Sequence, residues 1–154
     1  MIEGLGKIVA EHPFFADLET EFRELIAGCA KNIRFEAGEY IFREGGDADW
    51  FYLVRDGHVA LEVASGSGPS ISFQTLGRGE ILGASWLIPP YKWDFDARAV
   101  ERTRAIALDA VCLRTKCEEN HDLGWDLMKR FVPELSARMQ AARLQVLDVY
   151  GRKS

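Results

Sequence analysis

The chain lacks any long hydrophobic run. No window approaches the ~20 consecutive apolar residues that a membrane-spanning helix needs. The chain begins MIEGLGKIVAEHPFF, which carries an acidic residue early and has no apolar core of the kind found in secretory leaders. We therefore expect a cytoplasmic protein with neither a membrane segment nor a leader.

Cysteine and histidine are also scarce. The three cysteines, Cys29, Cys112 and Cys117, are odd in number and form no CxxC pair, which predicts reduced, mostly buried thiols in a chain without a leader. Cys117 and His121 lie four residues apart, but two ligands are too few for a structural zinc site. No P-loop, nucleophile elbow or paired acid motif is present. These absences predict a non-catalytic protein with no metal and no tightly bound cofactor.

Positive charge is not in excess. The chain has 19 Lys and Arg against 24 Asp and Glu, a formal net charge of −5. This balance argues against a general nucleic-acid binder, which usually carries a surplus of basic residues. The 47% of hydrophobic residues in 154 is ample for the core of one domain.

Two helical patterns come first. Residues 5–11 fit a short helix that ends at His12-Pro13, because proline disfavours helical geometry in the residue before it. Asp17 is the predicted N-cap of a second helix that ends near residue 30. The apolar positions of this second helix are spaced three and four apart and predict one buried stripe: Leu18, Phe22, Leu25, Ile26 and Cys29.

The pattern changes to strands from residue 32 onward. Short apolar runs separated by glycine turns, at roughly 8–12-residue spacing, are typical of an antiparallel sandwich or barrel. Asp56-Gly57 is a signal for a hairpin between two of these strands. The predicted strands cover residues 33–35, 40–42, 50–54, 58–64, 71–76 and 98–108.

Two helices are predicted after the strands, one capped by Asp109 and ending near residue 120, the other covering residues 122–150. Apolar residues of the longer helix recur at alternating spacings of four and three, as in a heptad seam. They are Met128, Val132, Leu135, Met139, Ala142, Val146 and Val149. We predict that this seam joins two copies of the chain, although packing of the whole helix on its own barrel stays open.

The long helix has a second apolar stripe and an internal proline. Leu127, Phe131 and Leu144 form the stripe, which is predicted to pack on the barrel. Pro133 predicts a kink or a break one turn earlier, because proline removes a backbone hydrogen bond.

Residues 38–59, GEYIFREGGDADWFYLVRDGHV, carry a family resemblance. The matching positions are Gly38, Ile41, Glu44, Gly45, Ala48, Asp49, Tyr52, Val54, Gly57 and Val59. This stretch resembles the first half of the cyclic-nucleotide-binding domain of the catabolite-activator and protein-kinase regulatory-subunit superfamily. The resemblance implies a mainly β fold: a double-stranded β-helix (jelly-roll) barrel with N-terminal helices and a long C-terminal helix.

The resemblance also implies a division of the chain. We expect an N-terminal helical segment in residues 1–31, the barrel in residues 32–108, and the C-terminal helices in residues 109–154. In the transcription-factor branch of the superfamily a winged helix-turn-helix follows the long helix. Only four residues follow Tyr150, so we expect no DNA-binding module in this chain.

Residues 79–100 resemble the family's phosphate-binding cassette, with replacements. In cyclic-nucleotide binders a Gly-Glu pair holds the ribose hydroxyl and a Pro-Arg pair leads the phosphate grip. Gly83 matches the cassette glycine, but Ala84 follows it in place of the acid. Trp86 occupies the place of a small residue. Lys92 and Trp93 stand where the Pro-Arg pair belongs.

These replacements remove the groups that grip a cyclic nucleotide. Without the arginine of the motif there is no bidentate fork for the phosphate, and Asp96 would repel it. Losing charge-assisted hydrogen bonds of ~1.5–3 kcal/mol each predicts weak or absent cAMP binding. The predicted ligand-binding positions are Gly83, Ala84, Ser85, Trp86, Lys92, Trp93, Asp96 and Arg98.

Three functions remain open at this point. The first is a stand-alone regulatory or sensor module that binds an unknown small ligand other than cAMP and forms a homodimer. In the second, aromatic residues such as Trp86 and Trp93 fill the cavity, and the chain is a structural dimeric interaction protein. The third is genuine binding of cAMP or cGMP. A haem sensor with a histidine ligand is conceivable on this fold, although His58 does not lie where a pocket ligand is expected.

Overall fold

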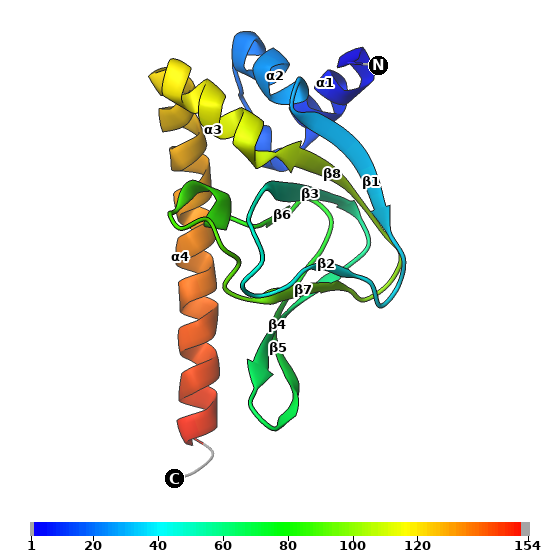
Figure 1. Ribbon diagram of the computed structural model, residues 1–154, viewed down its shortest axis with the longest axis vertical. Helices are drawn as coiled ribbons and strands as arrows, with labels where there is room; N and C mark the ends of the chain where they lie inside the picture. Colours follow the sequence, from blue (N-terminus) through cyan, green and yellow to red (C-terminus); the bar gives the residue numbers. More distant parts are fainter. Residues whose placement is uncertain (1, 152–154) are drawn as a thin grey trace.

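Two four-stranded antiparallel sheets form the centre of the protein, with helices before and after them in the chain (Figure 1). The computed structural model describes residues 2–151, and for residues 2–6, 145–146 and 149–150 it gives the backbone alone. The helical elements are α1 (Ile2–Glu11), η1 (Pro13–Phe15), α2 (Thr20–Ala27), η2 (Ser85–Leu87), α3 (Ala110–Glu119) and α4 (His121–Gly151). The strands are β1 (Ala30–Phe35), β2 (Tyr40–Phe42), β3 (Trp50–Asp56), β4 (Val59–Ser65), β5 (Gly68–Leu76), β6 (Ile81–Leu82), β7 (Asp96–Ala99) and β8 (Thr103–Asp109).

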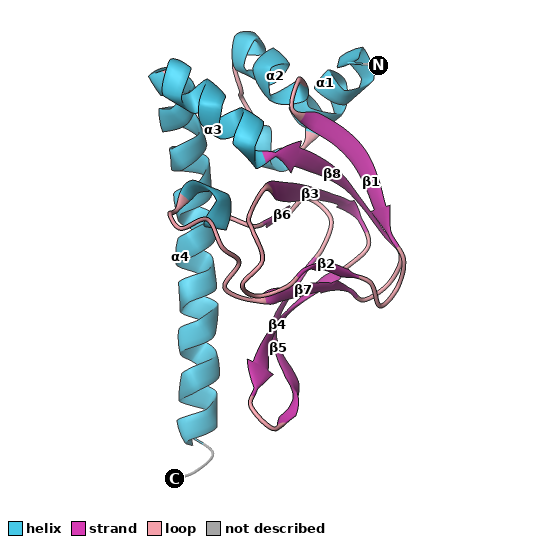
Figure 2. Cartoon of the chain, in the orientation of Figure 1, coloured by secondary structure: helices cyan, strands magenta, loops and turns pink. Residues whose placement is uncertain are grey.

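The two sheets enclose the core between them. One has the order β1-β8-β3-β6 and the other β2-β7-β4-β5. Strands rich in Phe, Leu, Ile and Val supply fully buried side chains from both sheets, such as Phe51 and Ile106 from the first and Leu61 from the second. The helices lie around the outside of the two sheets, as the colours of Figure 2 show. This arrangement confirms the predicted jelly-roll barrel with flanking helices.

The second helix begins later than the sequence suggested. Asp17 is not its N-cap: its φ is 63°, the left-handed conformation that Asp tolerates better than most residues. Glu19 caps the helix instead, and α2 begins at Thr20. The predicted apolar stripe is otherwise correct, because its members are buried or pack against the core.

Asp56-Gly57 does not close a hairpin. β3 pairs with β6 and β8, whereas β4 pairs with β5 and β7, so the chain crosses from one sheet to the other at this turn. The glycine is required by close approach as well as by its φ of +100°. A Cβ there would lie 2.5 Å from Thr103 Oγ1 and 2.6 Å from the carbonyl oxygen of Arg102. A turn signal predicts a reversal of direction, but it does not identify the strand's partner.

The two C-terminal helices follow the prediction closely at their starts. The Asp109 carboxylate accepts a hydrogen bond of 3.0 Å from the backbone N–H of Cys112, as an N-cap should. α4 runs along one side of the barrel and continues through Pro133 without a break (Figure 1). Leu127 and Phe131 are buried against the barrel, but Leu144 is exposed, so its assignment to the packing stripe was wrong.

The prediction of three reduced thiols was wrong. Cys29 and Cys112 form a disulfide with a Cα–Cα distance of 6.0 Å, and Cys117 is the free, half-buried thiol. The antiparallel pairing of β1 with β8 explains the contact. It sets Ala30 opposite Leu108, and the two cysteines lie just beyond that pair at the start of β1 and in the first turn of α3. Burial raises the pKa of the Cys117 thiol, and the charge of Glu118 adds to the shift.

Among the residues that the structure describes, no helix is long and apolar enough to cross a lipid bilayer. Nor does the described part of the chain bring three His, Cys, Asp or Glu side chains close enough together to hold a metal ion.

Candidate functional site

The predicted cassette is the segment between β6 and β7, and backbone hydrogen bonds fasten it to the loop after β2. Gly45 N–H donates to the carbonyl of Trp93 at 2.8 Å, and Trp93 N–H donates to the carbonyl of Gly46 at 3.0 Å. Ala48 N–H donates to the carbonyl of Tyr91 at 2.8 Å. The cassette is therefore held against the barrel by its own chain, independently of any ligand.

Trp93 fills space inside this site. Its side chain is 4% exposed and stacks on Phe42 with ring centroids 3.7 Å apart and planes 6° apart. Gly83, with a φ of +101°, lies against the edge of the ring: a Cβ there would be 2.5 Å from Trp93 Cη2. Phe95 packs edge-on against Phe42 at 5.5 Å. Trp93, which the resemblance placed at the position of the motif's arginine, is thus a core side chain.

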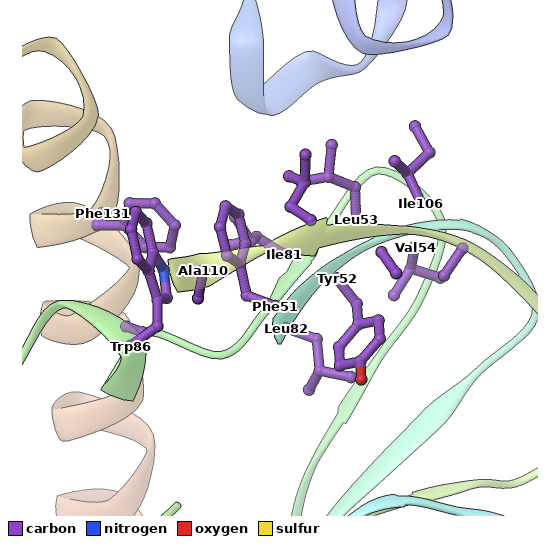
Figure 3. Close-up of a cluster of buried hydrophobic side chains, with 14 of the residues drawn as sticks. Phe51, Tyr52, Leu53, Val54, Ile81, Leu82, Trp86, Ile106, Ala110 and Phe131 are labelled. Carbon is purple, nitrogen blue, oxygen red and sulfur yellow. The ribbon is translucent and has the colours of Figure 1, made fainter. Parts of the chain in front are cut away.

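Trp86 is a second core side chain of the cassette. It is fully buried and stacks on Phe51 of β3 at 4.5 Å, with Phe131 of α4 edge-on at 5.5 Å. Figure 3 shows the three rings together between the barrel and α4. The indole Nε1 of Trp86 is buried and has no hydrogen-bond partner in the described part of the chain. The Trp86 side chain therefore joins η2, the barrel and α4 through apolar contact, without a hydrogen bond from its indole.

Arg114 of α3 holds the same turn from outside. Its Nη1 donates to the carbonyl oxygen of Trp86 at 2.8 Å, and its guanidinium lies 4.2 Å from the ring centroid of Tyr91. Tyr91 has a φ of 59°, a strained conformation for a non-glycine residue. Arg114 satisfies a carbonyl that η2 leaves free, so it stabilises the cassette and is not available to a ligand. Ser85 is the first residue of η2 and is half-buried.

Arg98, one of the predicted cations, is paired. Its Nη2 donates to Glu62 Oε2 at 2.9 Å, and its Nε lies 3.2 Å from the same oxygen. Glu62 is on β4, next to β7, and only 6% of it is exposed. The hydrogen bond that Arg98 donates to Glu62, and then the charge of Glu62, raise the pKa of Arg98 above its ordinary value. A buried carboxylate without this partner would be costly, so the pair is structural.

The other two predicted charges are also occupied. Asp96 is 7% exposed, accepts a hydrogen bond of 2.7 Å from Glu44 N–H and lies 3.5 Å from Arg43 Nε. Lys92 forms an ion pair with Asp47 at the rim of the loop. A phosphate entering here would meet the carboxylate of Asp96, which is already hydrogen-bonded to Glu44 N–H. The cations Lys92 and Arg98 would have to leave the carboxylates with which they are paired.

α4 contributes a cation that the sequence pattern did not reveal. Arg138 Nη2 donates to the carbonyl oxygen of Ile81 at 2.9 Å, and its guanidinium lies 5.8 Å from the ring centroid of Phe95. Burial lowers the pKa of Arg138, while the charges of Glu134 and Glu80 raise it in part. The apolar spacing of α4 predicts its two apolar stripes. No sequence signal marks one arginine among its polar residues as facing inward.

Most of the predicted dimer seam faces away from the barrel. Met128, Val132, Met139 and Ala142 are exposed, and Leu135 packs partly against the core. The side chain of Val146 lies outside the described residues. Trp125, three residues before Met128, is 65% exposed and extends the same spacing, although it was not predicted. The face is apolar, lies on a helix and has no partner within the described chain.

Comparison with known proteins agrees with this geometry. The model of the cyclic nucleotide-binding domain family matches residues 32–120, which span the barrel, the cassette and α3. The chain belongs to this family. Proteins of the family are regulatory and sensor domains, so the chain is a cyclic-nucleotide-binding-like regulatory or sensor domain.

The chain is similar to a solved structure from Geobacter metallireducens, that of a protein assigned as cyclic nucleotide-binding by inference. The similarity covers 89% of this chain and 96% of the Geobacter chain. It shares 31% sequence identity, with a TM-score of 0.76. The anaerobic regulatory protein of Bacillus subtilis is 21% identical over 88% of this chain and 57% of its own length. A cAMP-dependent protein kinase regulatory subunit of Emericella nidulans is 34% identical over 47% of this chain and 17% of its own length. The chain thus spans little more than half of one curated relative and a small part of the other.

Proposed function

We propose that this chain is a regulatory module of the cyclic-nucleotide-binding fold whose cassette is filled by its own side chains. On this proposal it does not bind cAMP or cGMP tightly, and it acts as a homodimer through α4. The observation that carries the proposal is the position of Trp93, which stacks on Phe42 and contacts Gly83 where the cassette would have to receive a ligand.

The electrostatics support the same proposal. Binding a cyclic phosphate needs a cation that is free to form a short bidentate contact. Of the cassette cations in the described chain, Arg98 is committed to Glu62 and Lys92 to Asp47. A phosphate that recruited Arg98 would leave the largely buried Glu62 carboxylate without its partner, which opposes binding.

Isothermal titration calorimetry with cAMP and cGMP tests the ligand part of the proposal. We expect no measurable heat of binding at protein concentrations suited to micromolar affinity. A thermal-shift series with other small metabolites runs beside it. Micromolar binding of either cyclic nucleotide would overturn the proposal. A shift with another metabolite that disappears in Trp93→Ala would instead favour an open cassette with a different ligand.

The dimer part rests on the exposed apolar face of α4. Met128, Val132 and Met139 leave water only if another surface covers them, and their heptad spacing suits a second copy of the same helix. Burying apolar area at about 25 cal/mol per Å² is the driving force.

Light scattering coupled to size-exclusion chromatography measures the dimer directly. We expect twice the chain mass of 17.3 kDa for the native protein, and dissociation in Met139→Glu. Gln140→Glu is the matched control, because it adds the same charge at the next exposed position. A monomeric native protein, or equal dissociation by both variants, would contradict this part of the proposal.

A further inference from the structure

A cavity of about 620 Å³ lies outside the cassette, between the N-terminal helices and one end of the β1-β8-β3-β6 sheet. Its size is within the range of about 300–1,000 Å³ that small-molecule sites occupy. None of its lining residues is a predicted ligand-binding position, although Gly79 is the first residue of the predicted cassette. They are Ile8, Glu11, His12, Pro13, Val54, Arg55, Asp56, Arg78, Gly79 and Arg104.

The charge of this cavity is opposite to that of the chain. Three arginines, Arg55, Arg78 and Arg104, face two carboxylates, Glu11 and Asp56, whereas the whole chain has a formal net charge of −5. A local cluster of arginines on an acidic protein concentrates positive potential in one place. Guanidinium groups match carboxylate and phosphate oxygens in geometry as well as in charge.

The arginines are only loosely engaged. Arg78 has no hydrogen bond or ion pair with any residue that the structure describes. Arg55 Nη1 donates to Asn32 Oδ1 at 3.2 Å, near the surface. Arg104 Nε lies 3.9 Å from Asp56 Oδ2, at the outer limit of an ion pair. These contacts contrast with the close, partly buried pairs of the cassette, so these guanidinium groups can turn to an incoming anion at little cost.

Strand pairing places a further arginine opposite Arg104, one of the arginines that line the cavity. Arg34 of β1 is the direct cross-strand partner of Arg104 of β8, an arrangement of like charges that normally destabilises a sheet. β3 pairs with the other side of β8. Between the pairs Val54–Ala105 and Asp56–Arg104, β3 moves by two residues and β8 by only one. Arg55 is therefore the extra residue of a β-bulge, a feature that redirects side chains and often lies beside binding sites.

The lining of the cavity also includes apolar side chains and a hydrogen-bonded histidine. Ile8, Pro13 and Val54 supply apolar surface. The buried His12 is fully bonded: its Nε2 lies 3.2 Å from the carbonyl oxygen of Val54, and its Nδ1 accepts from Phe14 N–H at 3.2 Å. Burial lowers the pKa of this imidazole, which favours the neutral form. The positive charge of the cavity therefore comes from the arginines, of which Arg78 and Arg104 are exposed, and not from the buried His12.

From this combination we propose that the cavity is a second binding site, for a small organic anion with an apolar body. The carboxylate or phosphate group of the ligand contacts Arg78 and Arg104, and its apolar part lies against Pro13 and Val54. The site is independent of the cassette: it requires neither a cyclic nucleotide nor an open space around Trp93.

A bound anion at this site would lie beside the turn between β5 and β6, where the cassette begins. The carbonyl of Val54 accepts from Gly79 N–H at 3.0 Å, and Val54 N–H donates to the carbonyl of Glu80 at 2.9 Å. Arg78 directly precedes these bonded residues in the chain. The ligand would therefore stabilise the turn that leads from β5 into β6 and the cassette.

NMR titration of the isotopically labelled full chain tests the site with three eight-carbon probes: octanoate, octyl phosphate and octanol. We expect the two anions to shift the amide resonances of residues 54–56 and 78–80, with octanol far weaker. Which anion binds more tightly distinguishes a carboxylate ligand from a phosphate ester. Equal binding of octanol, or shifts confined to residues 83–98 or to α4, would overturn the proposal.

Charge-removing variants give the sharper test. Arg78→Gln should weaken octanoate or octyl phosphate binding about tenfold or more, because a charge-assisted hydrogen bond contributes ~1.5–3 kcal/mol. Arg104→Gln should have a similar effect and serves as the second variant. Arg102→Gln is the matched control: it is exposed, removes the same charge and does not line the cavity. Equal affinity in Arg78→Gln, Arg104→Gln and the control would overturn the proposal.

Discussion

Replacing Gly83 with alanine tests how tightly Trp93 fills the cassette. Gly83 has a φ of +101°, and a Cβ there would lie 2.5 Å from Cη2 and 2.7 Å from Cζ3 of the Trp93 ring. The ring cannot move aside freely, because its face is stacked on Phe42 at 3.7 Å. The same added Cβ would lie 3.5 Å from the Cβ of Phe51, an ordinary van der Waals contact. The new methyl group therefore meets rigid neighbours.

The cost of Gly83→Ala has two parts that can be separated. The left-handed backbone costs an L-residue roughly 1–2 kcal/mol. Overpacking a rigid core adds about 1–3 kcal/mol, which brings the expected loss of unfolding free energy to roughly 2–5 kcal/mol. Gly45→Ala is the matched control, because Gly45 has a φ of +87° but no atom within 4 Å of its Cβ position. It should show the backbone part alone.

A double-mutant cycle with Trp93→Ala isolates the steric part. Removing the ring should cost about 3–5 kcal/mol by itself, as large-to-small core substitutions do. In that background Gly83→Ala should cost only about as much as Gly45→Ala, giving a coupling of roughly 1–3 kcal/mol. Urea unfolding followed by far-ultraviolet circular dichroism measures all four species. Equal costs of Gly83→Ala with and without the ring would refute the claim that Trp93 occupies this space.

Three further predictions follow from individual side chains. Trp86→Ala should cost about 3–5 kcal/mol of unfolding free energy. Trp86→Phe should cost clearly less in the same urea assay, because it keeps a ring on Phe51 and removes an N–H whose burial costs ~1–3 kcal/mol; equal losses would contradict this. Burial lowers the pKa of His12 below its ordinary value of 6.5, so the unfolded chain holds the proton more tightly. The contribution of His12 to stability is therefore complete above pH 6.5 and lost as the pH falls below it, and His12→Gln should flatten that decline in urea unfolding at a series of pH values. An unchanged pH profile in His12→Gln would argue against this role. Denatured, unreduced protein should react with Ellman's reagent at Cys117 alone, and at all three cysteines after reduction; three reactive thiols without reductant would show that the disulfide is absent.

The strands and the location of the cassette could be predicted because their signals are local. A run of strand-forming apolar residues marks β3 in the sequence, alternation marks β4, and the glycines mark the turns between strands. The direction of the chain after Asp56-Gly57 could not be predicted, because the partner of each strand is decided by packing far along the chain. The disulfide could not be predicted for a similar reason. Cys29 and Cys112 are 83 residues apart and meet only once β1 pairs with β8.

The side chains that fill the cassette could be predicted in part. The replacement of the motif's arginine by Trp93 is visible in an ungapped comparison of motifs, and burial of a tryptophan is an ordinary expectation. The partners of the charged residues were not visible. Arg43 with Asp96, and Arg138 with the carbonyl of Ile81, join elements that no short-range pattern connects. Sequence motifs therefore indicate which groups a site has lost more readily than which contacts replace them.

The contacts that replace the ligand-binding groups also fix the long helix. Phe131 of α4 packs against the Trp86 ring, and Arg138 of the same helix binds a carbonyl of β6. Both contacts use atoms of this chain alone, so the position of α4 on the barrel needs no ligand in the cassette. A ligand shifts a conformational equilibrium only through a difference in its affinity for the two states. Since Trp86 and Trp93 fill the cassette in this structure, the module we propose presents the apolar face of α4 without a cassette ligand, and its control would act at another surface, such as the arginine-lined cavity.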